Sequence, residues 1–203
     1  MTLASCDSRK TAGENPFFTE WDTPHGVPPF DKILPEHFMP AFERGMSLHE
    51  AEIDAITSNK DEATFENTIL AYDDAGQMLA QTELVFGMLC AAETNDRMQA
   101  LQEQAMPLLA AHRDKIRLDD KLFVRVKEVY DRRAALGLDA EQMRLLQKTY
   151  DSFVRAGALL DAEQKARLKE INGQLSLTAV KFGNNILAEN NNFVLELKSD
   201  ELN

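Results

Sequence analysis

The stretch SLHEAEIDA, residues 47–55, contains residue types that could form a zinc site on a helix. In the motif H-E-x-x-H, two histidines four residues apart share one helical face and bind zinc, while the glutamate activates water. His49 and Glu50 match the first two positions, but Ile53 stands where the second histidine is required. Because a hydrocarbon side chain cannot bind zinc, we interpret this stretch as an amphipathic helix without a metal.

The remaining candidates for chemistry do not form a recognisable site either. The four histidines are scattered, and His37 and His49 lie too far apart along one helix to share a metal. Cys6 and Cys90 form no C-x-x-C pair. The sequence contains no G-x-S-x-G motif and no phosphate-binding glycine loop. We therefore predict no catalytic residue and no metal ligand in this chain.

Two further features have simple structural interpretations. Adjacent aspartates at 73–74 and 119–120 are better explained as turn or cap residues than as acid–base pairs. Cys90 lies in the apolar run LVFGMLCAA and is expected to be a small buried core residue.

Residues 3–6, LASC, resemble a bacterial lipobox, in which an aliphatic residue and two small residues precede a cysteine that becomes lipidated. Cys6 is therefore the candidate lipidation site. Neither a positively charged n-region nor a long apolar h-region precedes it, although a secretory signal has both. Two locations stay open: a lipid-anchored protein of the bacterial cell envelope or periplasm, and a cytoplasmic protein.

The composition is that of an ordinary soluble domain. Of the 203 residues, 44% are hydrophobic and 28% are charged, which argues against wholesale disorder. The net charge of -12 argues against nucleic acid as a partner, since phosphate binding needs a basic face. The sequence contains no apolar run long enough for a transmembrane segment.

The elements that would position any site are predicted to be helices. Residues 16–35 carry five prolines and several aromatics, so we expect an extended segment that packs by its side chains. Beyond it, apolar residues recur at three- and four-residue steps, which predicts an all-α array of about six antiparallel-packed amphipathic helices. The breaks and caps divide these helices at about 36–56, 64–93, 95–117, 120–136, 139–160 and 161–190.

The end of the sequence changes in pattern. In the last helix, apolar residues at 168, 171, 175, 179, 182 and 186 form a heptad-like stripe suited to antiparallel packing. FVLEL at 193–197 then predicts a short strand, which needs a partner strand. We therefore expect a leader or tether at 1–15, a helical domain at 16–192, and the start of a strand region at 193–203 that belongs to something longer.

Read along its length, the chain resembles the N-terminal part of a bacterial peptidyl-dipeptidase of the thimet-oligopeptidase-like zinc metallopeptidases. The resemblance covers roughly residues 15–190 and is carried by ordered stretches, none of them a catalytic motif. These stretches are NPFF at Asn15, PPFDKILPEHFMPAFERGM at Pro28, HEAEIDAI at His49, FENTILA at Phe65, AAETND at Ala91, LFVRV at Leu122, RRAALGLDAEQMRLL at Arg132 and FVRAGALL at Phe153.

The resemblance implies a much longer parent enzyme in which two largely helical domains flank a deep channel. Its zinc site, of the H-E-F-G-H type, would lie far C-terminal to this region. The parent would remove dipeptides from the C-terminus of short oligopeptides. This chain would be a non-catalytic helical domain that forms one wall of the channel, without zinc of its own and inactive alone. Its partners would be the C-terminal catalytic domain of the same chain and the peptide substrates.

A second interpretation is a free-standing helical module of the bacterial envelope that binds peptides or another protein. Exposed residues in AETND, at 92–96, or LGLD, at 136–139, could contact a bound peptide, although both stretches are also typical of loops and caps. If a catalytic region normally covers an apolar face of this domain, the isolated chain should self-associate to bury that face.

Overall fold

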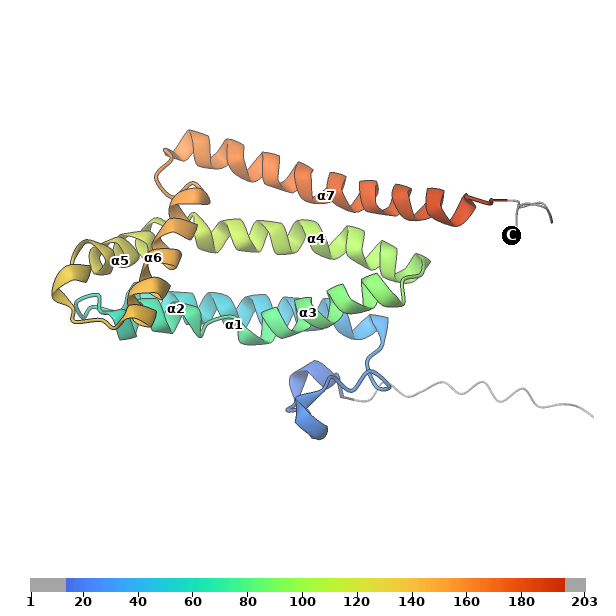
Figure 1. The fold of residues 1–203 in the computed structure, drawn as a ribbon, viewed down its shortest axis with the longest axis horizontal. Coiled ribbons are helices and arrows are strands. Elements are labelled where there is room, and N and C mark those ends of the chain that lie inside the picture. Colours follow the sequence, from blue (N-terminus) through green and yellow to red (C-terminus); the bar gives the residue numbers. More distant parts are fainter. Residues whose placement is uncertain (1–13, 196–203) are drawn as a thin grey trace, which may run out of the picture.

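The computed structural model describes residues 14–195 and confirms the all-α class. Helices α1, α3, α4 and α7 run along the long axis of the molecule, and α5 and α6 close one end (Figure 1). The bounds are α1 Phe38–Ser58, α2 Ala71–Asp73, α3 Gln77–Ala92, α4 Asp96–Arg117, α5 Asp120–Asp131, α6 Ala140–Arg155 and α7 Ala162–Asn192.

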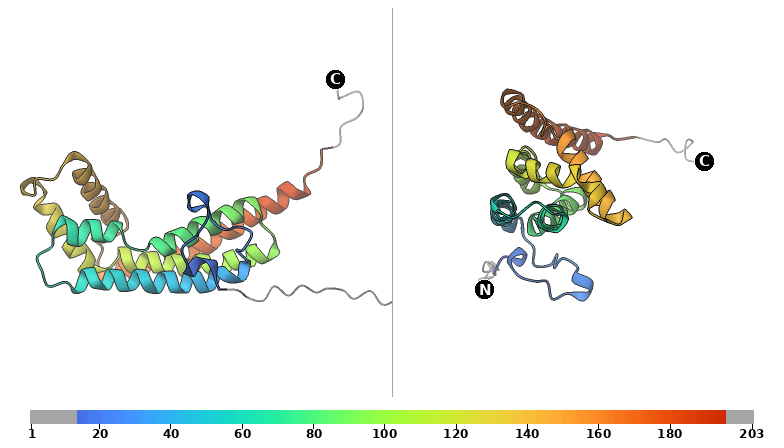
Figure 2. Two further views of the ribbon diagram at one scale, coloured as in Figure 1. Left: turned by 90° about the horizontal axis from the view of Figure 1, so that it is seen from below. Right: turned by 90° about the vertical axis from the view of Figure 1, so that its left-hand side faces the viewer.

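The long helices are stacked in layers. α4 packs against α7 on one side and against the α1–α3 pair on the other, and the right-hand view of Figure 2 shows this order. The chain alternates in direction through α1, α3, α4 and α7 (Figure 1). Among the described residues, α7 forms an outer layer whose most extensive contact is with α4.

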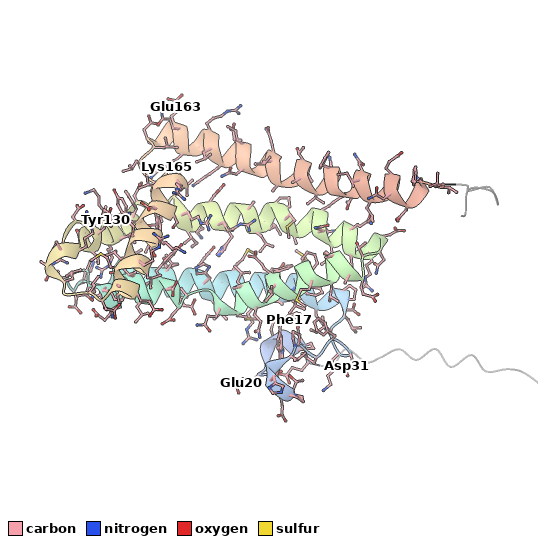
Figure 3. All side chains as sticks on the ribbon, in the orientation of Figure 1. Phe17, Glu20, Asp31, Tyr130, Glu163 and Lys165 are labelled. Atoms are coloured by element: carbon pink, nitrogen blue, oxygen red, sulfur yellow. The ribbon has the colours of Figure 1, made fainter. Side chains whose placement is uncertain are left out.

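The N-terminal segment packs by its aromatic side chains, as its proline content predicts. It forms three short 3-10 turns, at Pro16–Phe18, Pro24–Gly26 and Pro35–His37. The ring of Phe17 lies 5.3 Å from that of Phe38, and the Trp21 indole N–H donates to the Pro16 carbonyl over 2.8 Å. Figure 3 shows Phe17 where this segment meets the helices.

Side-chain caps begin most of the helices at the positions that the sequence indicates. The side chain of Asn95 caps α4 and that of Asp119 caps α5. Asp139 and Asp161 form capping boxes with the glutamine three residues later, at the starts of α6 and α7. The interpretation of Asp119 as a cap is therefore confirmed.

The single helix expected over residues 64–93 is interrupted. A π-helix, Phe65–Leu70, leads into the short α2. A turn at residues 74–76 then interrupts the helix before α3 begins at Gln77. Gly76 takes a φ of 76°, a left-handed conformation that glycine adopts without a Cβ clash. A close helix–helix approach occurs at Gly45, where an added Cβ would lie 3.0 Å from the backbone of Leu79.

Two hydrophobic clusters form the core. One lies at the end closed by α5 and α6, where Phe65, Leu122 and Phe153 are buried with residues from the end of α1. The other joins the N-terminal segment to α1, α3 and α4 around Phe42 and Phe86. Their rings meet edge to face at 5.3 Å. The two clusters share α1 and α4 but occupy different lengths of them.

Helix α6 is shorter than predicted, and the strand predicted after α7 stays a prediction. Helix α6 ends at Arg155, before the end predicted at 160, so Leu160 lies in the following turn and is 37% exposed. The predicted strand is not confirmed: 193–195 carry no strand, and residues 196–203 lie outside the described part. Within 14–195, no helix is long and apolar enough to cross a membrane.

Candidate functional site

Ile53 and His49 both lie on α1, the amphipathic helix predicted for this stretch. Ile53 is 3% exposed in the core, while His49 lies one turn earlier and is half-buried. Among residues 14–195, no group of three or more His, Cys, Asp or Glu side chains is arranged to hold a metal ion. The H-E dipeptide is thus part of the packing surface of α1.

The tertiary structure brings together two histidines that the sequence analysis treated as scattered. His49 of α1 and His112 of α4 are 63 residues apart, and their Nδ1 and Nε2 atoms lie 3.0 Å from each other. His112 is 5% exposed. Both histidines lie on the apolar stripes of their helices, and this was the one signal in the sequence that could have paired them.

Charged residues surround this pair. Glu50 Oε1 lies 3.5 Å from His112 Nδ1, and Glu50 Oε2 lies 2.8 Å from the Lys115 ammonium. The bond from Lys115 lowers the pKa of Glu50. Burial lowers the pKa of both histidines below the ordinary value of 6.5, and the charge of each cationic neighbour adds to this effect, while Glu50 opposes it. This arrangement is a buried polar contact between helices rather than an open catalytic centre.

The more extensive candidate for a functional site is an exposed apolar stripe along α7. The heptad-like stripe was expected to pack inward, but four of its residues point to solvent: Ile171, Leu175, Phe182 and Ile186 are 43%, 62%, 65% and 47% exposed. We call these four residues the α7 apolar face. Because exposed apolar patches of this kind mark interaction surfaces, this face is the best candidate for contact with another protein segment.

The side of α7 that packs on α4 carries a more polar set of residues and adjoins the α7 apolar face. Lys165 is 8% exposed and pairs with Asp120 at the start of α5; Figure 3 shows Lys165 at this end of α7. Further along, the Asn172 amide donates to Asp114 over 2.8 Å, and Val180 is buried. The helix is thus anchored by polar contacts while its larger apolar side chains stay uncovered.

The other sequence-based candidates have defined places or lie outside the structure. Cys6, the candidate lipidation site, is outside the described residues. Cys90 is only half-buried beside the second core cluster, where burial raises the pKa of its thiol. In AETND and LGLD, Asn95 and Asp139 are helix caps, so their polar atoms are already bonded.

Comparison with characterised proteins identifies what this helical chain is related to. It is 41% identical over 176 residues to the dipeptidyl carboxypeptidase of Escherichia coli (strain K12) and 38% identical over 174 residues to that of Salmonella typhimurium. These matches cover 87% and 86% of the chain. The chain is a relative of the bacterial dipeptidyl carboxypeptidases.

The resemblance to this peptidase family is therefore confirmed. The oligopeptidase A of Escherichia coli is a more distant relative, 24% identical over 165 residues. The chain spans about a quarter of the length of the relatives that it matches, 26% for both dipeptidyl carboxypeptidases. A search of protein-family models finds no match.

Proposed function

We propose that this chain is the non-catalytic helical domain of a zinc metallopeptidase that releases C-terminal dipeptides from short oligopeptides. The α7 apolar face carries the proposal. Leu175 and Phe182 are each more than 60% exposed on this face, and a domain that works alone rarely leaves such an apolar patch uncovered. The relatives support it, since they are named as peptidases and extend over about four times the matched length.

In this proposal, the helical array forms one wall of the channel through which peptides reach the zinc site. The catalytic region of the same polypeptide supplies the zinc ligands and packs on the α7 apolar face. Since the polar contacts of Lys165 and Asn172 already hold α7 on the rest of the domain, the face can be covered without rearrangement of the helices. The 203-residue chain alone is expected to be inactive.

The test compares the 203-residue chain with the product of the complete native reading frame that contains it. We expect the complete protein to release dipeptides from a short oligopeptide in a chelator-sensitive manner, and the chain alone to release none. Chelator-sensitive hydrolysis by the chain alone would overturn the proposal, and so would a complete reading frame that encodes no further domain.

A second set of variants tests the contact itself within the complete protein. Leu175→Glu/Phe182→Glu should lower dipeptide release and expose the junction to proteolysis, because two charges would be buried against the catalytic region. Gln174→Glu, at an exposed position on the same helix, is the matched control and should leave both properties unchanged. Equal behaviour of the two variants would show that the α7 apolar face does not contact the catalytic region.

The same face could instead serve a free-standing module of the bacterial envelope that binds a separate partner. The reading-frame experiment separates the two functions, because this alternative requires no catalytic region in the same polypeptide. For location, we propose a lipid anchor at Cys6 on the basis of the LASC pattern, with a cytoplasmic protein as the alternative.

A further inference from the structure

The paired histidines lie at the boundary between the two hydrophobic clusters. On α1, His49 falls between Phe42 of one cluster and Ile53 of the other. On α4, His112 falls between Leu109 and Ile116, which belong to the same two clusters. The His49–His112 contact is therefore a polar joint in the middle of an interface that is apolar on both sides.

Proton counting shows that this joint tolerates only certain charge states. His49 Nδ1 and His112 Nε2 face each other at 3.0 Å, so one of them must donate and the other accept. When both histidines are neutral, one of the two facing nitrogens can carry hydrogen and the other can accept the bond. When one histidine is protonated, its facing nitrogen donates, and the facing nitrogen of the neutral histidine still accepts. With two extra protons, both facing nitrogens carry hydrogen, so the bond is lost and two positive charges oppose each other.

The neighbouring charges favour one extra proton but give little support to a second. From α1, Glu50 faces His112 Nδ1, but its other oxygen already binds Lys115. Glu52 accepts the Gly76 N–H over 2.7 Å. From α3, Glu83 pairs with Arg113 of α4 over 3.6 Å. Each nearby carboxylate is thus already engaged, and the two cationic side chains of α4 oppose further protonation.

The His49 ring also lies close to the backbone of the α2–α3 loop. A Cβ added to Gly76 would lie 2.9 Å from His49 Nδ1, so the backbone of this loop packs directly on the imidazole. A doubly protonated pair would relieve its repulsion by separating the two rings, which loosens the contact between α1 and α4.

We propose that His49 and His112 form a pH-sensitive joint between α1 and α4, which keeps the two cores together with at most one extra proton and opens on binding a second. The inference stands independently of the proposed peptidase role, because it concerns only contacts within the helical array. Acidification would loosen the middle of the domain while both apolar clusters remain packed.

The direction of the pH effect follows from the positions of the two pKa values. Burial holds the pKa of each histidine below 6.5 in the folded chain, whereas the unfolded chain binds protons near 6.5. The stabilisation is therefore complete above about pH 6.5 and is lost as the pH falls from there toward the lowered pKa values of the folded chain.

The experiment replaces the pair with a neutral pair of similar geometry, His49→Asn/His112→Gln. The Asn side-chain oxygen lies near the position of Nδ1 and the Gln side-chain nitrogen near that of Nε2, so one hydrogen bond can persist without titration. Thermal unfolding of both chains is followed from about pH 7.5 to about pH 5. We expect the melting temperature of the original chain to fall more steeply with acidification than that of the variant.

A control variant and a direct measurement complete the test. His25→Asn removes an exposed histidine and should leave the steep fall intact. Imidazole ¹H–¹⁵N spectra of the original chain should show His49 and His112 titrating in two steps separated by at least about one pH unit. The proposal would be overturned if the melting temperatures of the original and double-variant chains fell equally with pH. It would also be overturned if His49 and His112 titrated independently near pH 6.5.

Discussion

Substitution of Gly76 by alanine tests how tightly the α2–α3 loop is coupled to the histidine pair. Two effects destabilise this variant. Alanine disfavours the left-handed conformation at φ 76° by about 1–2 kcal/mol, of which about 0.4–1 kcal/mol is offset because alanine also restricts the unfolded chain. In addition, the new Cβ would lie 2.9 Å from His49 Nδ1 and displace the ring from His112.

The displaced ring should lose a buried hydrogen bond, which contributes about 1 kcal/mol. Gly76→Ala is thus expected to lower the free energy of unfolding by about 2 kcal/mol. Gly137→Ala is the matched control, because Gly137 has a similar φ of 63° but no atom within 4 Å of an added Cβ. That control should lose only about 1 kcal/mol, from the backbone alone.

Urea-induced unfolding of both variants measures the difference, and thermal unfolding should place Gly76→Ala about 2–4 °C below Gly137→Ala. In a His49→Ala background, the contact with the ring no longer exists, so Gly76→Ala should become equivalent to the control. Equal losses for the two glycine variants in the original chain would refute the argument that the loop positions His49.

Three further predictions follow from other parts of the chain. Arg125→Leu should lower the free energy of unfolding, measured in urea, by about 3 kcal/mol. The reason is that this buried guanidinium donates to the Asn59 and Asp61 carbonyls and to the Asn67 side chain. Arg144→Ala, at an exposed position, should change it by less than about 0.5 kcal/mol. Sedimentation velocity should show concentration-dependent self-association of the 203-residue chain, and charges introduced on the α7 apolar face by Leu175→Glu/Phe182→Glu should abolish it; a monomeric original chain at high concentration would contradict this. If Cys6 is lipidated, the protein expressed in bacteria should incorporate labelled fatty acid and Cys6→Ser should not, and equal labelling of both would exclude Cys6 as the attachment site.

The helices could be predicted well because their signals are local. Asn95, Asp119, Asp139 and Asp161 each cap a helix through bonds to backbone groups two or three residues away, so the side-chain type and the spacing are sufficient evidence. The break at Gly76 was missed because glycine within an apolar pattern is compatible with either a weakened helix or a left-handed turn. What decides for the turn is the Glu52 carboxylate, 24 residues earlier, which binds the Gly76 N–H.

The sequence by itself determined the all-α class, the positions of most caps, the absence of an H-E-x-x-H motif and the kinship with bacterial dipeptidyl carboxypeptidases. Only the tertiary structure decided which apolar stripes are covered. The periodicity of α7 predicts an amphipathic helix equally well whether Leu175 and Phe182 face a neighbour or solvent, since periodicity reports a face and not its partner. In the same way, only the packing of α1 on α4 could bring His49 to His112, because a contact across 63 residues depends on the arrangement of both helices.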